Sequence, residues 1–231
     1  MESAFGINYE ILYGSGAFSM LKIQLRRGMS IKAQSDAMVT MDTTLKVEGK
    51  LEGGVLGGLG RLLSRENFFF QTIRAVDGDG ETLLAPATLG DVADLEMDGT
   101  PYYVQKGGFF AATEGVTIST KMQNLASGLF GGEGLFVLEA SGQGLLFVES
   151  FGAIHIVDIP PGKDIIIDNH HLVAWPRHIP YRLEKASQGW LSSMTSGEFL
   201  VFRFQGPGRV LIQSRNNAGF GQWIKQLLPS N

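Results

Sequence analysis

Three pairs of glycines recur at a fixed interval along the chain, and this regularity constrains its fold more than any other feature of the sequence. The pairs are Gly78-Asp79-Gly80, Gly142-Gln143-Gly144 and Gly206-Pro207-Gly208, and successive pairs begin 64 residues apart. Self-similarity at a fixed interval is typical of one supersecondary unit used several times. We therefore expect three structural repeats.

A second set of glycines supports the same division. Gly28, Gly99 and Gly162 each lie ten residues before a pair of apolar residues, Met38-Val39, Phe109-Phe110 and Leu172-Val173 respectively. The first copy is longer by about six residues, which we assign to an insertion in the glycine-rich stretch 53–60. The copies then cover about 19–90, 91–152 and 153–215, followed by a tail over 216–231. No linker rich in proline or serine separates them, so we expect residues 1–231 to form a single domain.

The local pattern predicts β-structure almost throughout. Leu21–Leu25 and Val116–Ser119 alternate apolar with polar residues, as half-buried strands do. Leu135–Leu138 is apolar on both faces and leads through a glycine pair into Leu145–Val148, which predicts a hairpin turn at the pair. Short strands at this spacing, about six per copy, favour an all-β sandwich or barrel.

One helix is expected, in the C-terminal tail. Apolar residues there follow helical spacing, and Pro229 stops the pattern. The stripe consists of Phe220, Trp223, Ile224, Leu227 and Leu228. We expect it to be buried either against its own barrel or across a subunit boundary.

Composition is that of a compact globular protein. Hydrophobic residues make up 44% of the chain, which is enough for a sizeable core. Cysteine is absent, so disulfides and thiolate metal sites are excluded and a reducing compartment is allowed. The N-terminus lacks the pattern of a signal peptide, and no apolar run approaches the ~20 residues needed to span a bilayer. We expect a cytoplasmic, bacterial-type protein.

The C-terminal half carries a family resemblance. The segments are Gly197–Phe202, Gly206–Arg215 and His171–Trp175, with Gly108–Ala111 in the middle copy. Together they resemble bacterial proteins related to the altered-inheritance-of-mitochondria family, which is implicated in mitochondrial biogenesis. The resemblance covers nearly the whole chain. It implies three copies of a short double-stranded β-helix, a jelly-roll-like unit similar to the subunit of the tryptophan RNA-binding attenuation protein, in a pseudo-threefold arrangement and assembled as a homotrimer. It brings no catalytic residues.

Asp168, His170 and His171 are the only metal-site candidates that stand out. Imidazole and carboxylate groups suit zinc, nickel or iron. The aligned segments in the other copies, 34–37 and 105–108, lack this set and read as polar turns between strands. We therefore favour a turn here and expect no bound metal or other cofactor.

Catalytic and phosphate-binding motifs are missing from the sequence. The chain has no Gly-x-Ser-x-Gly elbow and no His-Glu-x-x-His, and a phosphate loop would need a following helix or a Lys-Ser/Thr pair after its glycines. The glycine-rich stretch Gly53–Arg61 is not closed by a lysine, so it is not a phosphate loop either. A carboxylate pair assembled in three dimensions remains open. We expect no enzyme, with a ligand- or metal-binding protein of unrecognised enzymatic activity as the alternative.

Nucleic acid is an unfavourable partner for this chain. It has 19 basic and 23 acidic residues, a net charge of −4, and no basic block with interleaved aromatics. Arg26-Arg27 is the only adjacent basic pair, and a solvated turn before Gly28 explains it.

Large apolar residues embedded among small ones precede each glycine pair at equivalent places. Such residues make plausible contact surface, since contiguous apolar patches usually mark a protein or membrane interface. The interface candidates are Leu62, Leu63, Leu129, Phe130, Trp190 and Leu191, together with Trp223 in the tail. The alternative is that these loops fold back as lids on the barrel. We expect a non-enzymatic scaffold or binding protein, a homotrimer that contacts a protein or a membrane surface through these loops.

Overall fold

The computed structural model describes residues 3–14, 18–50, 70–123, 135–185 and 200–228. Within these ranges the protein is built from β-strands, with two short 3-10 turns and one C-terminal helix. The all-β prediction with a single terminal helix is confirmed.

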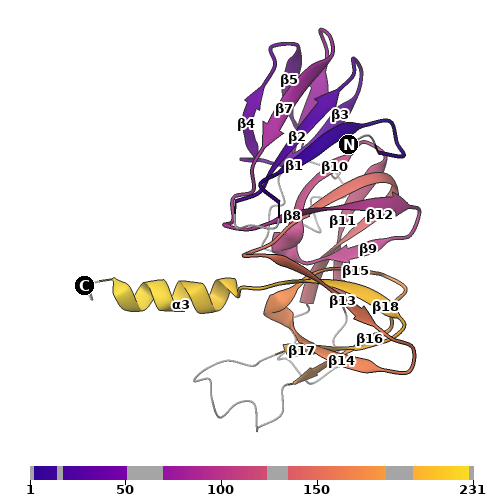
Figure 1. The fold of residues 1–231 in the computed structure, drawn as a ribbon, viewed down its shortest axis with the longest axis vertical. Helices are drawn as coiled ribbons and strands as arrows, with labels where there is room; N and C mark the ends of the chain where they lie inside the picture. The colour runs from indigo at the N-terminus through magenta and orange to yellow at the C-terminus, as the bar shows by residue number, and fades with distance from the viewer. Residues whose placement is uncertain (1–2, 15–17, 51–69, 124–134, 186–199, 229–231) are drawn as a thin grey trace.

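The strands follow one another along the long axis of the molecule, from the N-terminal strands at one end to the last hairpins at the other (Figure 1). The N-terminal third contains β1 (Asn8–Leu12), β2 (Met20–Leu25), β3 (Ser30–Gln34), β4 (Met38–Met41), β5 (Leu45–Lys50), β6 (Phe70–Ala75) and β7 (Gly80–Leu84). The middle third contains β8 (Val92–Asp98), β9 (Tyr102–Val104), η1 (Lys106–Gly108), β10 (Phe109–Thr113), β11 (Val116–Gln123) and β12 (Leu135–Glu149). The last third contains β13 (Ile154–Ile159), β14 (Asp164–Asp168), η2 (Asn169–His171), β15 (Leu172–Pro176), β16 (Tyr181–Lys185), β17 (Leu200–Gln205), β18 (Gly208–Gln213) and α3 (Asn217–Leu227).

The strands form three hydrogen-bonded sheets. The first has the order β1-β2-β7-β4, and the last has the order β14-β17-β16. Between them lies an 11-stranded sheet in the order β13-β18-β15-β9-β12-β10-β3-β6-β5, to which β8 and β11 add by pairing with β12. All the strand pairs are antiparallel, so each sheet can cover one side of a core and face solvent on the other.

Three clusters of buried side chains lie between the sheets. The first is centred on Leu21, Ile73 and Phe147, the second on Phe109 and Leu146. The third is centred on Trp175, whose ring lies within 6 Å of those of Tyr181, Phe202 and Phe204. The core therefore runs through the whole length of the described chain.

The glycine pairs do not form the hairpin turns that the sequence predicts. β6 and β7 flank Gly78 and Gly80 but pair with different strands, and so do β17 and β18 around Gly206. At Gly142 the chain does not turn at all, because β12 runs through the pair from Leu135 to Glu149. Its first half pairs with β9 and β11, and its second half with β8 and β10.

The pairs at Gly78 and Gly206 thus carry the chain from one sheet to another, whereas at Gly142 the strand β12 stays in one sheet and changes its partner strands. At Gly142 the backbone has φ 106°, in the left-handed region that favours glycine. A Cβ atom there would also collide with the carbonyl oxygen of Gly115, in the turn between β10 and β11. The need for glycine is real, but its cause is close backbone approach at a strand crossing rather than a hairpin.

The other glycine landmarks are turns, as predicted. Gly28, Gly99 and Gly162 have φ of 91°, 111° and 74°, and each lies between two consecutive strands. Nothing lies within 4 Å of a Cβ built on any of them, so backbone conformation alone requires glycine there.

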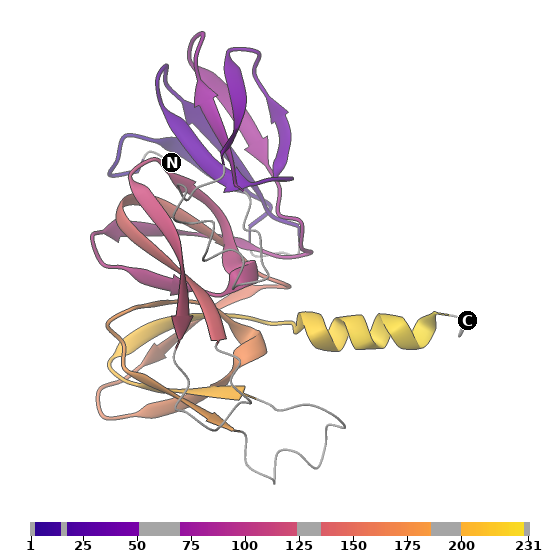
Figure 2. The same ribbon diagram turned by 180° about the vertical axis from the view of Figure 1, so that it is seen from behind.

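The predicted C-terminal helix is confirmed as α3, which projects sideways from the body in both views (Figures 1 and 2). The side chain of Asn216 caps it by accepting hydrogen bonds from the backbone N–H groups of Ala218 and Gly219. Phe220 contacts Phe151 of the body, but no residue of the helix is buried, so the apolar stripe is not buried against its own barrel. No helix among the described residues is long and apolar enough to cross a membrane.

Candidate functional site

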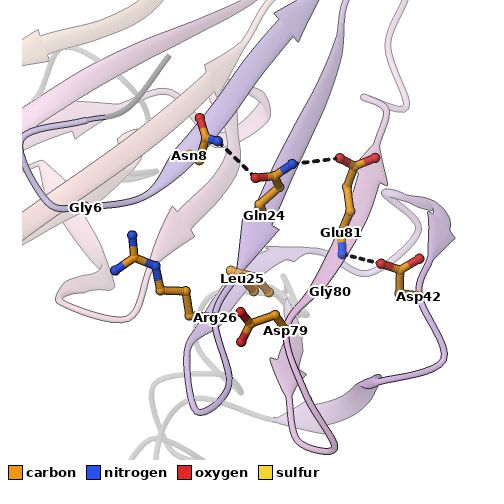
Figure 3. Close-up of a pocket in the computed structure, with 9 residues that line it drawn as sticks. All are labelled: Gly6, Asn8, Gln24, Leu25, Arg26, Asp42, Asp79, Gly80 and Glu81. Carbon is orange, nitrogen blue, oxygen red and sulfur yellow. Dashed lines mark hydrogen bonds between the residues drawn. The ribbon is translucent and has the colours of Figure 1, made fainter.

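A surface pocket of about 610 Å³ lies at the N-terminal end of the protein, between β1, β2 and β7 (Figure 3). It is lined by Gly6, Asn8, Gln24, Leu25, Arg26, Asp42, Asp79, Gly80 and Glu81. The sequence did not single out this site, because its polar residues come from segments far apart in the chain.

A row of polar side chains crosses the pocket because the residues are opposite one another in the β1-β2-β7 sheet. Asn8 lies opposite Gln24, and Gln24 lies opposite Glu81. The amide of Asn8 donates to Gln24 Oε1 at 2.9 Å, and the amide of Gln24 donates to Glu81 Oε2 at 3.4 Å (Figure 3). These exposed hydrogen bonds hold the side chains across the sheet surface.

The two aspartates of the pocket hold loops in place. Asp42 Oδ2 accepts a hydrogen bond from the backbone N–H of Glu81 at 2.8 Å. Asp79 Oδ1 accepts one from the backbone N–H of Arg27 at 2.7 Å. Each carboxylate satisfies a main-chain donor at a turn, which is a common structural use of aspartate.

The chemistry that this pocket offers is limited. Its nine lining residues include no histidine, serine, threonine, cysteine, lysine or tyrosine. Three carboxylates face one guanidinium, so the recess is polar with an excess of negative charge. Two of its three carboxylates, those of Asp42 and Asp79, already accept hydrogen bonds from backbone N–H groups.

Glu149 is the most perturbed acid in the described structure, and it lies away from the pocket at the end of β12. The side chain is only 2% exposed. Gln34 Nε2 donates to its Oε1 at 2.5 Å, and the hydroxyl of Thr88 donates to its Oε2 at 3.2 Å. Burial raises the pKa of Glu149 to about 7, although these two hydrogen bonds oppose the shift. The sequence signal was a glutamate directly after four apolar residues, which does not reveal burial by itself.

The histidine segment forms a polar turn between two strands, as predicted. It is the 3-10 turn η2, and Asp168 Oδ1 accepts from the backbone N–H of His170 at 2.9 Å. His171 Nδ1 lies 2.8 Å from the carbonyl oxygen of Gln213, so that ring is engaged by the backbone of β18. Among the described residues no group of three His, Cys, Asp or Glu side chains is placed to hold a metal ion.

Most of the predicted interface residues lie outside the described residues. These are Leu62, Leu63, Leu129, Phe130, Trp190 and Leu191. Trp223 lies on α3 and is 54% exposed, so it is available for contact. Its neighbour Phe220 touches Phe151 of the body, with ring centroids 5.1 Å apart.

Comparison with known proteins gives a consistent set of relatives. The family model for mitochondrial biogenesis AIM24 matches residues 9–215. A protein of Streptococcus pyogenes serotype M6, described as uncharacterized, is 34% identical over 221 residues, covering 93% of this chain and 88% of the relative. The crystal structure of a second Streptococcus pyogenes protein superimposes with a TM-score of 0.78 at 32% identity, covering 96% of this chain and all of the other.

Proposed function

The chain belongs to the AIM24 family, and from that premise we propose that it is a non-enzymatic scaffold or binding protein that works as a homotrimer of three-repeat subunits. The cytoplasm is its proposed location. The observation that carries the proposal is the recurrence of one pattern of strand pairing along the chain.

The pairing pattern supports three repeats. Each repeat is a set of six strands: β2 to β7, β8 to β12 with the two halves of β12 counted separately, and β13 to β18. The first strand of each set pairs with the last, as β2 does with β7, β8 with the second half of β12, and β13 with β18. The third strand joins the other side of the last strand, as β4, β10 and β15 do. Each of these third strands shifts register by one residue at the same place, after Met38, Phe109 and Leu172. Three matching β-bulges are difficult to explain except by a shared unit.

The remaining strands support a jelly-roll-like unit. The fifth strand of each set lies between the second and the fourth, as β6 does between β3 and β5, and β17 between β14 and β16. The first half of β12 lies between β9 and β11 in the same way. Each set therefore divides into two groups of three paired strands, the first, third and sixth in one and the second, fourth and fifth in the other, which is the arrangement expected of a short double-stranded β-helix.

A non-enzymatic role agrees with the chemistry of the described residues. Glu149, the carboxyl group whose pKa burial raises to about 7, is only 2% exposed and so is closed to a substrate. In the pocket of about 610 Å³, the carboxylates of Asp42 and Asp79 already accept hydrogen bonds from backbone N–H groups. Perturbed titratable groups in an accessible cleft are the usual mark of an active site, and here the two features lie apart.

The proposed contact surface for a protein or a membrane is supplied by three segments, 51–69, 124–134 and 186–199, which lie outside the described residues. They follow β5, β11 and β16 in the sequence and carry the apolar candidates Leu63, Phe130 and Leu191. Each segment falls between the fourth and fifth strands of its set, and contiguous apolar patches usually mark an interface.

Light scattering coupled to size exclusion tests the assembly. A homotrimer of this 25.1 kDa chain has a mass of about 75 kDa. We expect that mass at micromolar concentration, together with no stoichiometric metal by elemental analysis. A 25.1 kDa species would refute the homotrimer, and retained metal would favour a metal-binding protein instead.

A further inference from the structure

Two junctions inside the chain follow the same rule. β10 pairs with β3, and β15 pairs with β9, both antiparallel. In each case the third strand of one six-strand set pairs with the second strand of the preceding set. Main-chain hydrogen bonds therefore join the sets into continuous sheets.

The register of the two junctions is also the same. Ala111 lies opposite Ala33, and Ala174 lies opposite Val104. Counted from the turn glycines Gly28, Gly99 and Gly162, the residue twelve positions on always faces the residue five positions on in the preceding set. The same count predicts the register for any other third strand that pairs with a second strand.

In the described chain, one third strand and one second strand have no such pairing. β4 ends the sheet β1-β2-β7-β4, and it is a third strand with no preceding set. β14 ends the sheet β14-β17-β16, and it is a second strand with no following set. Within the part of the chain that the structure describes, both offer an open edge.

Burial differs sharply between β4 and its equivalents. All five residues of β10 and all five of β15 are buried. In β4, Met38 is 38% and Val39 is 48% exposed. On β14, Ile166 is 40% exposed. β4 contains no charged residue, and β14 has three consecutive isoleucines between Asp164 and Asp168. Apolar edge strands promote pairing with another chain, and proteins usually protect them with lysine, proline or a covering element.

We propose that β4 pairs with β14 of a second copy of this chain, as a continuation of the two internal junctions. The pairing is antiparallel and places Thr40 opposite Ile167, and Met41 opposite Ile166, of the partner subunit. The proposal rests on the proposed homotrimer and specifies the surface that forms it. Because the two edges differ, the contact is heterologous, and a ring closes when three copies complete the rotation.

The shape of the molecule agrees with this arrangement. Figure 1 shows β4 and β14 near opposite ends of the long axis, so one chain cannot satisfy both edges by itself. Each subunit instead offers one edge to each of two neighbours.

Disulfide trapping tests the register, because the natural chain contains no cysteine. We would mix Met41→Cys protein with Ile166→Cys protein under mild oxidation. Directly opposite residues of an antiparallel pair have Cα atoms about 4.5–5.5 Å apart, within the range that a disulfide accepts. We expect a covalent dimer in the mixture and none from either protein alone. The chain carrying both substitutions should give covalent trimers.

The matched control shifts the register by two residues while keeping the same face of the strand. Met41→Cys mixed with Asp164→Cys should crosslink at least tenfold more slowly, because diagonal neighbours lie about 7–8 Å apart. Equal rates for the two mixtures, or no crosslink in the first, would overturn the proposed pairing.

A charge pair provides a second measurement. Ile166→Lys should reduce the mass to that of a monomer with unchanged circular dichroism, since this side chain is already 40% exposed. Adding Met41→Glu should restore the trimer, because opposite charges facing across a strand pair attract. A wild-type trimer that persists in Ile166→Lys would place the interface elsewhere and leave the homotrimer standing. A monomeric wild-type protein would overturn both.

Discussion

Glu149 should make the stability of this protein fall as the pH rises, and the effect can be estimated from its surroundings. Its described hydrogen-bond partners, Gln34 and Thr88, are neutral, and burial holds its pKa at about 7 against 4.5 for an ordinary glutamate. The folded protein therefore keeps this proton up to a higher pH than the unfolded chain does. The stabilising contribution is fully present below pH 4.5 and is lost as the pH passes about 7.

The expected magnitude follows from the size of the shift. At 1.36 kcal/mol for each pKa unit, the shift corresponds to about 3 kcal/mol lost from the free energy of unfolding between pH 4.5 and 8. Glu149→Gln replaces the acid by a neutral amide of the same shape, and its oxygen can still accept from Gln34. This variant should match the wild type near pH 4 and exceed its stability by up to about 3 kcal/mol at pH 8.

Urea unfolding at several pH values measures this difference, provided that the slope of the transition stays constant. The matched control is Glu96→Gln, an exposed glutamate on β8, which should differ from the wild type by less than about 0.5 kcal/mol at every pH. The comparison between variants removes the contribution of the other carboxylates. If the difference between Glu149→Gln and the wild type does not change with pH, the assignment of a proton to buried Glu149 is wrong.

Two further outcomes are expected. Phe202→Ala should cost about 3–5 kcal/mol in chemical denaturation, because this ring is fully buried in the third cluster, whereas Trp223→Ala on exposed α3 should cost under about 0.5 kcal/mol. A triple variant with Leu63, Phe130 and Leu191 changed to serine should keep its melting temperature and circular dichroism but lose sedimentation with liposomes or binding to a co-purified partner. If this variant melts like a core variant, these residues are lids instead of a contact surface.

Local physical chemistry determined several features that could be predicted from the sequence. The turns at Gly28, Gly99 and Gly162 follow from positive φ, which glycine adopts without strain. The helix over 217–227 follows from its spacing of apolar residues and its capping asparagine. The all-β class follows from period-2 patterns, and the family from sequence similarity.

Interactions between distant strands decided the rest. A strand, a glycine pair and another strand have the same sequence pattern whether the two strands pair with each other or pair with different partners, so the sequence predicts a hairpin at Gly142 where the structure has one continuous strand. Only the tertiary structure places Gly115 against that glycine.

Burial likewise depends on the neighbours that a strand acquires. The apolar pair at the start of β4 resembles those of β10 and β15 in sequence, yet it is exposed because no preceding set of strands covers it. Glu149 looks like any glutamate at a strand end, and its pKa is raised because the fold buries it, although Gln34 of β3 and Thr88 after β7 donate hydrogen bonds that oppose the rise. Composition and spacing specify which residues can form strands. The pairing of strands far apart in the chain decides which side chains lose contact with water, and hence which groups change their chemistry and which edges stay open.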